Sequence, residues 1–254
     1  MSVSNNSNVK DGNGTIISAF PVFSLGGVSA NWATNQGSGI CDFQQHTFKG
    51  LSRNMEFMPN SKIKIGVLAS GRGSNFQALI DGSASGEVAC DIAVLITDNP
   101  NAQAIERAKK AGIPFEIVKF KEFPNRELAD KKIAELLEQY RVELVVLAGY
   151  MLILRGKEIF LAYPNRIINI HPSLLPQFKG STHAQKDAFE AGLKVSGLTI
   201  HFVTEDVDGG EIIYQEKIDI GDCKSADEVS EKILVREHAA MKKVVDEFAK
   251  GKYG

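Results

Sequence analysis

The chain has 254 residues and a mass of 27.7 kDa, with 43% hydrophobic and 24% charged residues, enough for one buried core and an appendage. Its net charge of −2 gives no reason to expect nucleic acid or a membrane as a partner. The cysteines, Cys41, Cys90 and Cys223, stand far apart and in no paired motif, which argues against a disulfide framework or a metal site and favours the reducing cytoplasm.

The first 60 residues differ in composition from the rest. They are rich in Asn, Ser and Gly and show no lasting period, so we predict a disordered N-terminal extension over 1–60 and a folded domain over 61–254. A transit peptide is disfavoured because acidic residues occur at positions 11, 42 and 56. A start of translation at Met55 or Met58 stays open.

Strands and helices alternate after residue 61. Apolar, β-branched runs predict strands at 63–68, 92–97, 115–118, 144–147 and 167–170. Amphipathic segments predict helices at 75–80, 102–111 and 125–140, the second of which ends at Gly112. This order predicts an α/β fold with a doubly wound, mostly parallel sheet.

The pattern changes after a helix predicted at 183–191. Two long strands, at 195–203 and 212–220, are joined through an Asp-Gly-Gly turn at 208–210. A closing helix follows at 225–250, with Ser225 as its N-cap and Glu228 at the capping-box position. We therefore expect a modified C-terminal strand pair and a closing helix at this edge of the sheet.

A glycine-rich loop, Ser-Gly-Arg-Gly-Ser-Asn at 70–75, follows the first predicted strand and opens the first helix. Its backbone N–H groups and the helix N-terminus suit a phosphate group. A tight turn with no ligand stays open as an alternative. A nicotinamide dinucleotide is disfavoured because Phe76 stands where its fingerprint requires a third glycine.

Asn169 and His171 end the fifth predicted strand and point to the same side. The carboxyl ends of such strands are where α/β sheets bind ligands, and Asp208 lies in the later Gly-Gly turn. An amide, an imidazole and a carboxylate can hold a carbonyl oxygen and transfer protons. We expect Asp208 to raise the pKa of His171. For His201, structural and functional roles stay open.

Spacing alone leaves three other features open. The hydrophobic stretch 149–154 suits either plain core or the wall of an apolar pocket. Arg126, at a helix start, suits either a solvated charge or a contact to a ligand carboxylate. Glu237, on the closing helix, reads by default as an ordinary surface acid.

Four segments together carry a resemblance to a known family. They are SGRGSN at 70–75, AGYMLIL at 148–154, NIHPSLLP at 169–176 and GLTIHFVTEDVDGG at 197–210. Residues 62–250 thereby resemble the folate-dependent phosphoribosylglycinamide formyltransferases. The resemblance implies transfer of a formyl group from 10-formyltetrahydrofolate, a co-substrate, to the amine of 5-phosphoribosylglycinamide in purine (IMP) biosynthesis. The alternative is a formyltetrahydrofolate hydrolase, which shares the catalytic residues but passes the formyl group to water.

The resemblance also assigns residues to three groups. The catalytic positions are Asn169, His171 and Asp208; the ribonucleotide positions are Gly73, Ser74, Asn75 and Glu237; and the folate positions are Arg126, Met151, Leu152, Ile153, Leu154 and, again, Asn169. Leu152 departs from members with a basic residue there, so side-chain help for the folate is in doubt at that position. We expect small-molecule substrates, no metal, a cytoplasmic location and a monomer or homodimer.

Overall fold

The computed structural model describes residues 9–10, 16–17 and 62–253. Within the predicted N-terminal extension it describes two short strands, β1 (Val9–Lys10) and β2 (Ile16–Ile17), which pair antiparallel. The other residues of the extension predicted to be disordered lie outside the described residues.

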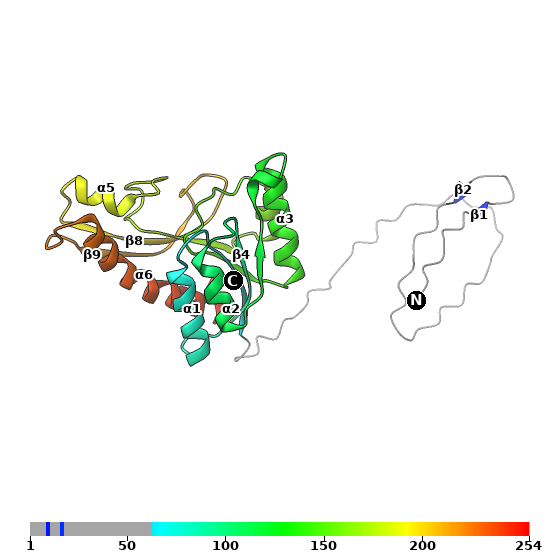
Figure 1. Cartoon of the computed structure of the whole chain (residues 1–254), viewed down its shortest axis with the longest axis horizontal. Coiled ribbons are helices and arrows are strands. Elements are labelled where there is room, and N and C mark those ends of the chain that lie inside the picture. The colour runs from blue at the N-terminus through cyan, green and yellow to red at the C-terminus, as the bar shows by residue number, and fades with distance from the viewer. Residues whose placement is uncertain (1–8, 11–15, 18–61, 254) are drawn as a thin grey trace, which may run out of the picture. The chain divides into compact units, whose positions relative to one another are not determined.

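One seven-stranded sheet forms the centre of the folded region, in the order β5-β4-β3-β6-β7-β8-β9 (Figure 1). Neighbours from β5 to β7 are parallel, whereas β8 is antiparallel to both β7 and β9. The predicted mostly parallel sheet with a modified C-terminal strand pair is therefore confirmed. The strands are β3 (Ile63–Leu68), β4 (Cys90–Thr97), β5 (Phe115–Ile117), β6 (Leu144–Leu147), β7 (Ile167–His171), β8 (Val195–Phe202) and β9 (Ile212–Asp219).

The helices follow the predicted order with two additions. They are α1 (Ser74–Ser85), α2 (Gln103–Ala111), η1 (Phe120–Glu122, a 3₁₀ helix), α3 (Arg126–Gln139), α4 (Lys157–Ala162), α5 (Ala184–Glu190) and α6 (Ala226–Ala249). The additions are η1 and α4, which are too short to show a helical period in the sequence. Helix α1 runs five residues beyond its predicted end and stops at Gly86, whose φ of 79° suits a glycine cap. Among the described helices none is long and apolar enough to cross a membrane.

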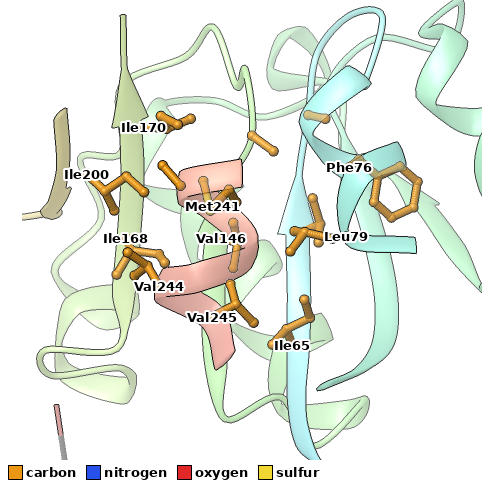
Figure 2. Packing of buried hydrophobic residues seen from close by; sticks show 14 of the residues in the cluster. Ile65, Phe76, Leu79, Val146, Ile168, Ile170, Ile200, Met241, Val244 and Val245 are labelled. Carbon is orange, nitrogen blue, oxygen red and sulfur yellow. The ribbon is translucent and has the colours of Figure 1, made fainter. Parts of the chain in front are cut away.

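Helices cover both faces of the sheet, so its parallel strands bury side chains on both sides. On one face, Phe76 and Leu79 of α1 and Met241, Val244 and Val245 of α6 belong to one buried cluster, with α6 on the side of Ile168 of β7 and α1 on the side of Ile65 of β3 (Figure 2). On the other face, α3 and α4 bury residues such as Ile133 and Ile159 against alternate residues of the same strands. The core thus fixes the ends of β3, β6 and β7 relative to one another.

Two helix termini match the capping chemistry of the sequence. Gly112 follows α2 with φ 68° and donates its N–H to Lys109 O. At the start of α6, Ser225 Oγ accepts from the Glu228 N–H at 3.2 Å. The Glu228 carboxylate in turn accepts from the Lys224 N–H at 2.8 Å, one residue before the position that a standard capping box uses.

Candidate active site

A cavity of about 450 Å³ opens at the carboxyl ends of β3, β6 and β7. The chain runs from β3 outward through β4 to β5 and then returns to the other side of β3 with β6. The cavity therefore lies where the strand order reverses, the usual ligand site of an open α/β sheet. Its lining comes from 71–75, 147–154, 169–172, 180–182, 203–204 and 207–208, with one residue each from β8 and α5 and two from α6.

Asn169, His171 and Asp208 line this cavity together. His171, 5% exposed, places Nδ1 3.5 Å from Asp208 Oδ2. Its Nε2 lies 3.1 Å from the carbonyl oxygen of Phe178. Asp208 has a left-handed φ of 48°, and its Oδ2 accepts the Gly180 N–H at 2.9 Å. The structure thus brings together an amide, an imidazole and a carboxylate from segments almost 40 residues apart in sequence.

Asp208 raises the pKa of His171, as expected, but the pKa as a whole lies below the ordinary value for histidine. Burial lowers the pKa of His171 and outweighs the opposing effects of Asp208 and the Phe178 carbonyl. For Asp208 burial acts to raise the pKa, but contacts from His201 and from the Gly180 N–H outweigh it and lower the pKa to about 2. The carboxylate is therefore charged at neutral pH, while the imidazole is more easily deprotonated than an ordinary histidine.

His201, whose role the sequence left open, lies on β8 opposite Asn169 of β7 and lines the cavity. Its Nδ1 lies 2.8 Å from Phe202 O, and this nitrogen must carry a proton because a carbonyl oxygen only accepts. Its Nε2 lies 3.3 Å from Asn169 Nδ2 and 3.4 Å from Asp208 Oδ1. Nε2 can therefore accept from the Asn169 amide when it is unprotonated, or donate to Asp208 when it is protonated.

The ribonucleotide positions gather where α1 begins. Gly73 has φ 66°, and a Cβ there would approach Ala104 Cβ to 2.8 Å, so both conformation and packing favour glycine. Asn75 Nδ2 donates to Glu237 Oε2 at 2.8 Å, and both side chains are buried. Burial raises the pKa of Glu237 against the effects of Asn75 and Arg72. Glu237 is thus a buried cavity residue, not the surface acid that the sequence suggested by default.

The segment 149–154, here called the wall segment, lines the cavity throughout. Met151 and Ile153 are 54% and 46% exposed, whereas Leu154 is buried. The interpretation of this stretch as one wall of a pocket therefore agrees with the structure. Leu152 also lines the cavity, although it offers no charge there.

Arg126 is a predicted folate residue that the structure does not place in the cavity lining. Its guanidinium lies 5.4 Å from the centre of the Phe120 ring and 5.9 Å from that of the Tyr150 ring. Its Nε is 3.2 Å from Asp130 Oδ1. Arg126 therefore packs against Tyr150, and it is Tyr150 that lines the cavity.

Ser70 is a cavity-edge residue whose individual role the sequence did not reveal. Its hydroxyl donates to Asp98 Oδ1 at 2.5 Å and accepts the Met151 N–H at 2.9 Å. It thus ties the glycine-rich loop to the wall segment. The only signal was its position at the head of the loop motif.

Within 62–253 no group of three or more His, Cys, Asp or Glu side chains is placed to hold a metal ion.

Comparison with known proteins agrees with this geometry. Residues 63–245 match the formyl transferase family. The chain belongs to that family. This formyl transferase is 40% identical over 189 residues to phosphoribosylglycinamide formyltransferase of Haemophilus influenzae, covering 74% of this chain and 88% of the relative. It is 41% identical over 175 residues to the Bacillus subtilis protein of the same name, covering 69% and 89%.

Solved structures and longer relatives extend the comparison. The crystal structure of glycinamide ribonucleotide transformylase 1 from Symbiobacterium toebii has 43% sequence identity and a TM-score of 0.72, covering 74% of this formyl transferase and 88% of that chain. Trifunctional purine biosynthetic protein adenosine-3 of Bos taurus is 39% identical over 189 residues, which span only 18% of its length. The resemblance to phosphoribosylglycinamide formyltransferases is confirmed, and these matches give no support to the hydrolase alternative.

Proposed function

We propose that this formyl transferase moves the formyl group of 10-formyltetrahydrofolate to the amine of 5-phosphoribosylglycinamide in purine biosynthesis. One observation carries the proposal: the His171–Asp208 pair lies in a single cavity with a helix N-terminus on one side and a largely apolar wall on the other. A phosphate-bearing amine suits the first side and a flat heteroaromatic donor suits the second. The names of the similar proteins agree with this pairing.

The residues present suit attack by an amine. A primary amine is already a nucleophile, so the reaction needs no serine or cysteine. As the amine attacks the formyl carbon, the carbonyl oxygen becomes an oxyanion, which the N–H groups of Asn169 and protonated His171 would stabilise. The incoming nitrogen must then lose one proton and the departing folate nitrogen must gain one. Asp208, 3.5 Å from His171, stabilises the imidazolium that this exchange requires.

The ribonucleotide would occupy the side of the cavity at α1. The backbone N–H groups of Gly73, Ser74 and Asn75 lie at a helix N-terminus, where a phosphate is favoured by the unpaired donors and the helix dipole. Asn75 Oδ1 is buried and has no hydrogen-bond partner among the described residues. Glu237, held by Asn75, offers a carboxylate acceptor to the sugar or the amine.

The formyl donor would lie against the wall segment, from Met151 to Leu154, with its carbonyl toward Asn169. The exposed side chains of Met151 and Ile153 provide apolar surface for a flat ring. Arg126 stays a predicted contact for a donor carboxylate. Its Nε and Nη2 are buried and donate no hydrogen bond within the described part of the chain, which leaves donors for such a group.

The deciding experiment measures tetrahydrofolate release from 10-formyltetrahydrofolate by the purified protein, with and without the ribonucleotide. We expect release only when the ribonucleotide is present, together with formylated ribonucleotide in equal amount. Release in its absence would identify the hydrolase and refute the transferase. His171→Ala is the control for a contaminating enzyme. This variant should release no tetrahydrofolate, whether or not the ribonucleotide is present.

The cellular setting is a further part of the proposal. We infer a reducing compartment, the cytoplasm, supported by Cys90 and Cys223, which are both free thiols. A monomer or homodimer stays our prediction for the assembly, and sedimentation velocity tests it.

A further inference from the structure

Asp130 is a buried carboxylate behind the cavity that none of the proposed catalytic steps uses. It lies in the second turn of α3, is 0% exposed, and sits among apolar side chains such as Ala129, Ile133 and Leu154. Burial raises the pKa of Asp130, while N–H donors and Arg126 oppose the rise. A carboxylate in such surroundings is costly unless it is well paired, so its contacts are informative.

One oxygen of Asp130 holds the chain just after the wall segment. Oδ2 accepts the backbone N–H of Arg155 at 2.5 Å and that of Gly156 at 2.9 Å. A Cβ on Gly156 would come within 2.8 Å of Asp130 Cβ and 3.1 Å of Glu127 O. The backbone after the wall therefore lies directly against α3, and only glycine fits there without displacement.

The other oxygen reaches the beginning of the wall segment through Arg126. Oδ1 lies 3.2 Å from Arg126 Nε, close enough for an ion pair but without hydrogen-bond alignment. The guanidinium faces the ring of Tyr150 at 5.9 Å. Tyr150 is the second residue of the wall segment and lines the cavity. One carboxylate thus supports both ends of the wall segment: it binds the backbone directly after the last residue, and it holds Arg126 against Tyr150 near the first.

The wall segment depends on such contacts because it has no regular secondary structure. It lies between the end of β6 and the start of α4, so no strand ladder or helix holds residues 150–154. On the cavity side, Ser70 makes two described hydrogen bonds to it: Ser70 Oγ accepts the Met151 N–H, and the Ser70 N–H donates to Gly149 O. On the opposite side, Asp130 and Arg126 supply the support.

We propose that Asp130 is a positioning residue for the formyl donor: it fixes both ends of the wall segment and so sets donor affinity without contacting either substrate. This inference rests on the proposed function, because the wall segment is the surface assigned to the donor. The ribonucleotide side, formed by α1 and Glu237, makes no contact with Asp130 among the described hydrogen bonds and ion pairs. The effect of Asp130 should therefore be confined to one substrate.

Asp130→Asn tests the inference. The asparagine keeps the size but has a single carbonyl oxygen, so its –NH₂ group must face either the two backbone N–H groups or Arg126. We expect the KM for 10-formyltetrahydrofolate to rise about tenfold or more, as fits the loss of charged hydrogen bonds. The KM for the ribonucleotide and kcat at saturating donor should stay within about twofold. Glu127→Gln, an exposed carboxylate on the same helix, is the matched control and should change neither KM.

Hydrogen exchange of the Arg155 and Gly156 amides provides a readout independent of activity. Exchange should be faster in Asp130→Asn than in Glu127→Gln when both have the same thermal midpoint. Equal exchange, or a tenfold rise in both KM values, would overturn the positioning role. If wild-type protein transfers no formyl group, the proposed function fails, and the exchange comparison still shows whether Asp130 holds the wall.

Gly156→Ala keeps the test decisive if Asp130→Asn does not fold. It retains the carboxylate but pushes the end of the wall away from α3. We expect the same selective rise in donor KM. A folded Gly156→Ala protein with unchanged donor KM would refute the inference.

Discussion

Burial disfavours the charged forms of both His171 and Asp208, which lie 3.5 Å apart, but the other contacts outweigh this effect only at Asp208. Asp208 receives enough donors to stay charged, with a pKa of about 2. His171 is 5% exposed and contacts the Phe178 carbonyl oxygen, and burial lowers its pKa despite the neighbouring carboxylate. The protonated imidazole therefore depends on Asp208 more than an exposed histidine would.

Asp208→Asn should lower kcat about 100-fold or more, which is a common loss for general acid–base groups. If protonated His171 is required, kcat/KM falls as pH rises above the pKa of His171, which already lies below its ordinary value. Removing Asp208 removes a group that raises this pKa, so the fall should move to lower pH. A pH–rate profile checks both the size and the direction. Glu205→Gln, an exposed neighbour, should match wild type, and a shift to higher pH in Asp208→Asn would contradict the mechanism.

Asn75→Ala should weaken both stability and ribonucleotide binding. Asn75 gives the buried Glu237 carboxylate its hydrogen bond, and its loss leaves an unpaired acceptor that costs about 1–3 kcal/mol in the free energy of unfolding. Urea unfolding measures this loss, and steady-state kinetics should show a higher KM for the ribonucleotide. Ser74→Ala keeps the backbone N–H and removes only the hydroxyl beside the proposed phosphate position, so it should raise the ribonucleotide KM alone. A change confined to donor KM in either variant would mean that the two substrate ends are misassigned.

Sequence reasoning located residues at strand ends better than it described their surroundings. Asn169, His171 and Asp208 could be predicted to meet because parallel strands end at one edge of a sheet and a Gly-Gly turn returns to it. The lowered pKa of His171 could not be predicted, because the backbone that contacts it, at Phe178, belongs to a loop with no periodic pattern. Asp130 was missed for a related reason: four residues after Arg126, it is indistinguishable in sequence from an exposed helical ion pair.

At the level of elements, α6 is held at its start by side-chain capping. Ser225 Oγ accepts the Glu228 N–H, and this helix carries Glu237 into the cavity. Ser225→Ala should lower the free energy of unfolding by about 1 kcal/mol. Ser230→Ala is the matched control, because its hydroxyl only bonds back to Ala226 O within the helix and alanine favours helix. Thermal or urea unfolding should therefore show a loss for the first variant and none for the second; equal losses would contradict the capping role.

Elements with a strong period were predictable and short ones were not. The helix at 125–140 and the closing helix match α3 and α6 within a residue or two at each end. Helix α1 was predicted too short because Gly82 and the serines around it weaken the helical pattern. Gly82 is nevertheless buried, and a Cβ there would approach Val88 Cγ2 to 2.8 Å, so packing against the turn that precedes β4 explains the glycine.

At the scale of the whole molecule, the cavity joins the two halves of the sheet. The β3–β5 half supplies the glycine-rich loop that we propose binds the phosphate, whereas the β6–β9 half supplies the wall segment and the proposed catalytic residues. Strand alternation predicted the mostly parallel sheet, and the structure confirms it. The width of the cavity was not predictable, because it depends on how α6 packs across both halves (Figure 2).

A chain that begins at Lys62 should retain formyl transfer. The core starts at Ile63, the family match starts at the same residue, and every cavity-lining residue described lies between 71 and 237. We therefore expect kcat/KM for both substrates within about twofold of the 254-residue protein, with a thermal midpoint changed by no more than a few degrees. Steady-state kinetics and calorimetry on both proteins provide the measurement. Loss of activity with an unchanged midpoint would show that residues before 62 contribute to the site, whereas loss of folding would place them in the core.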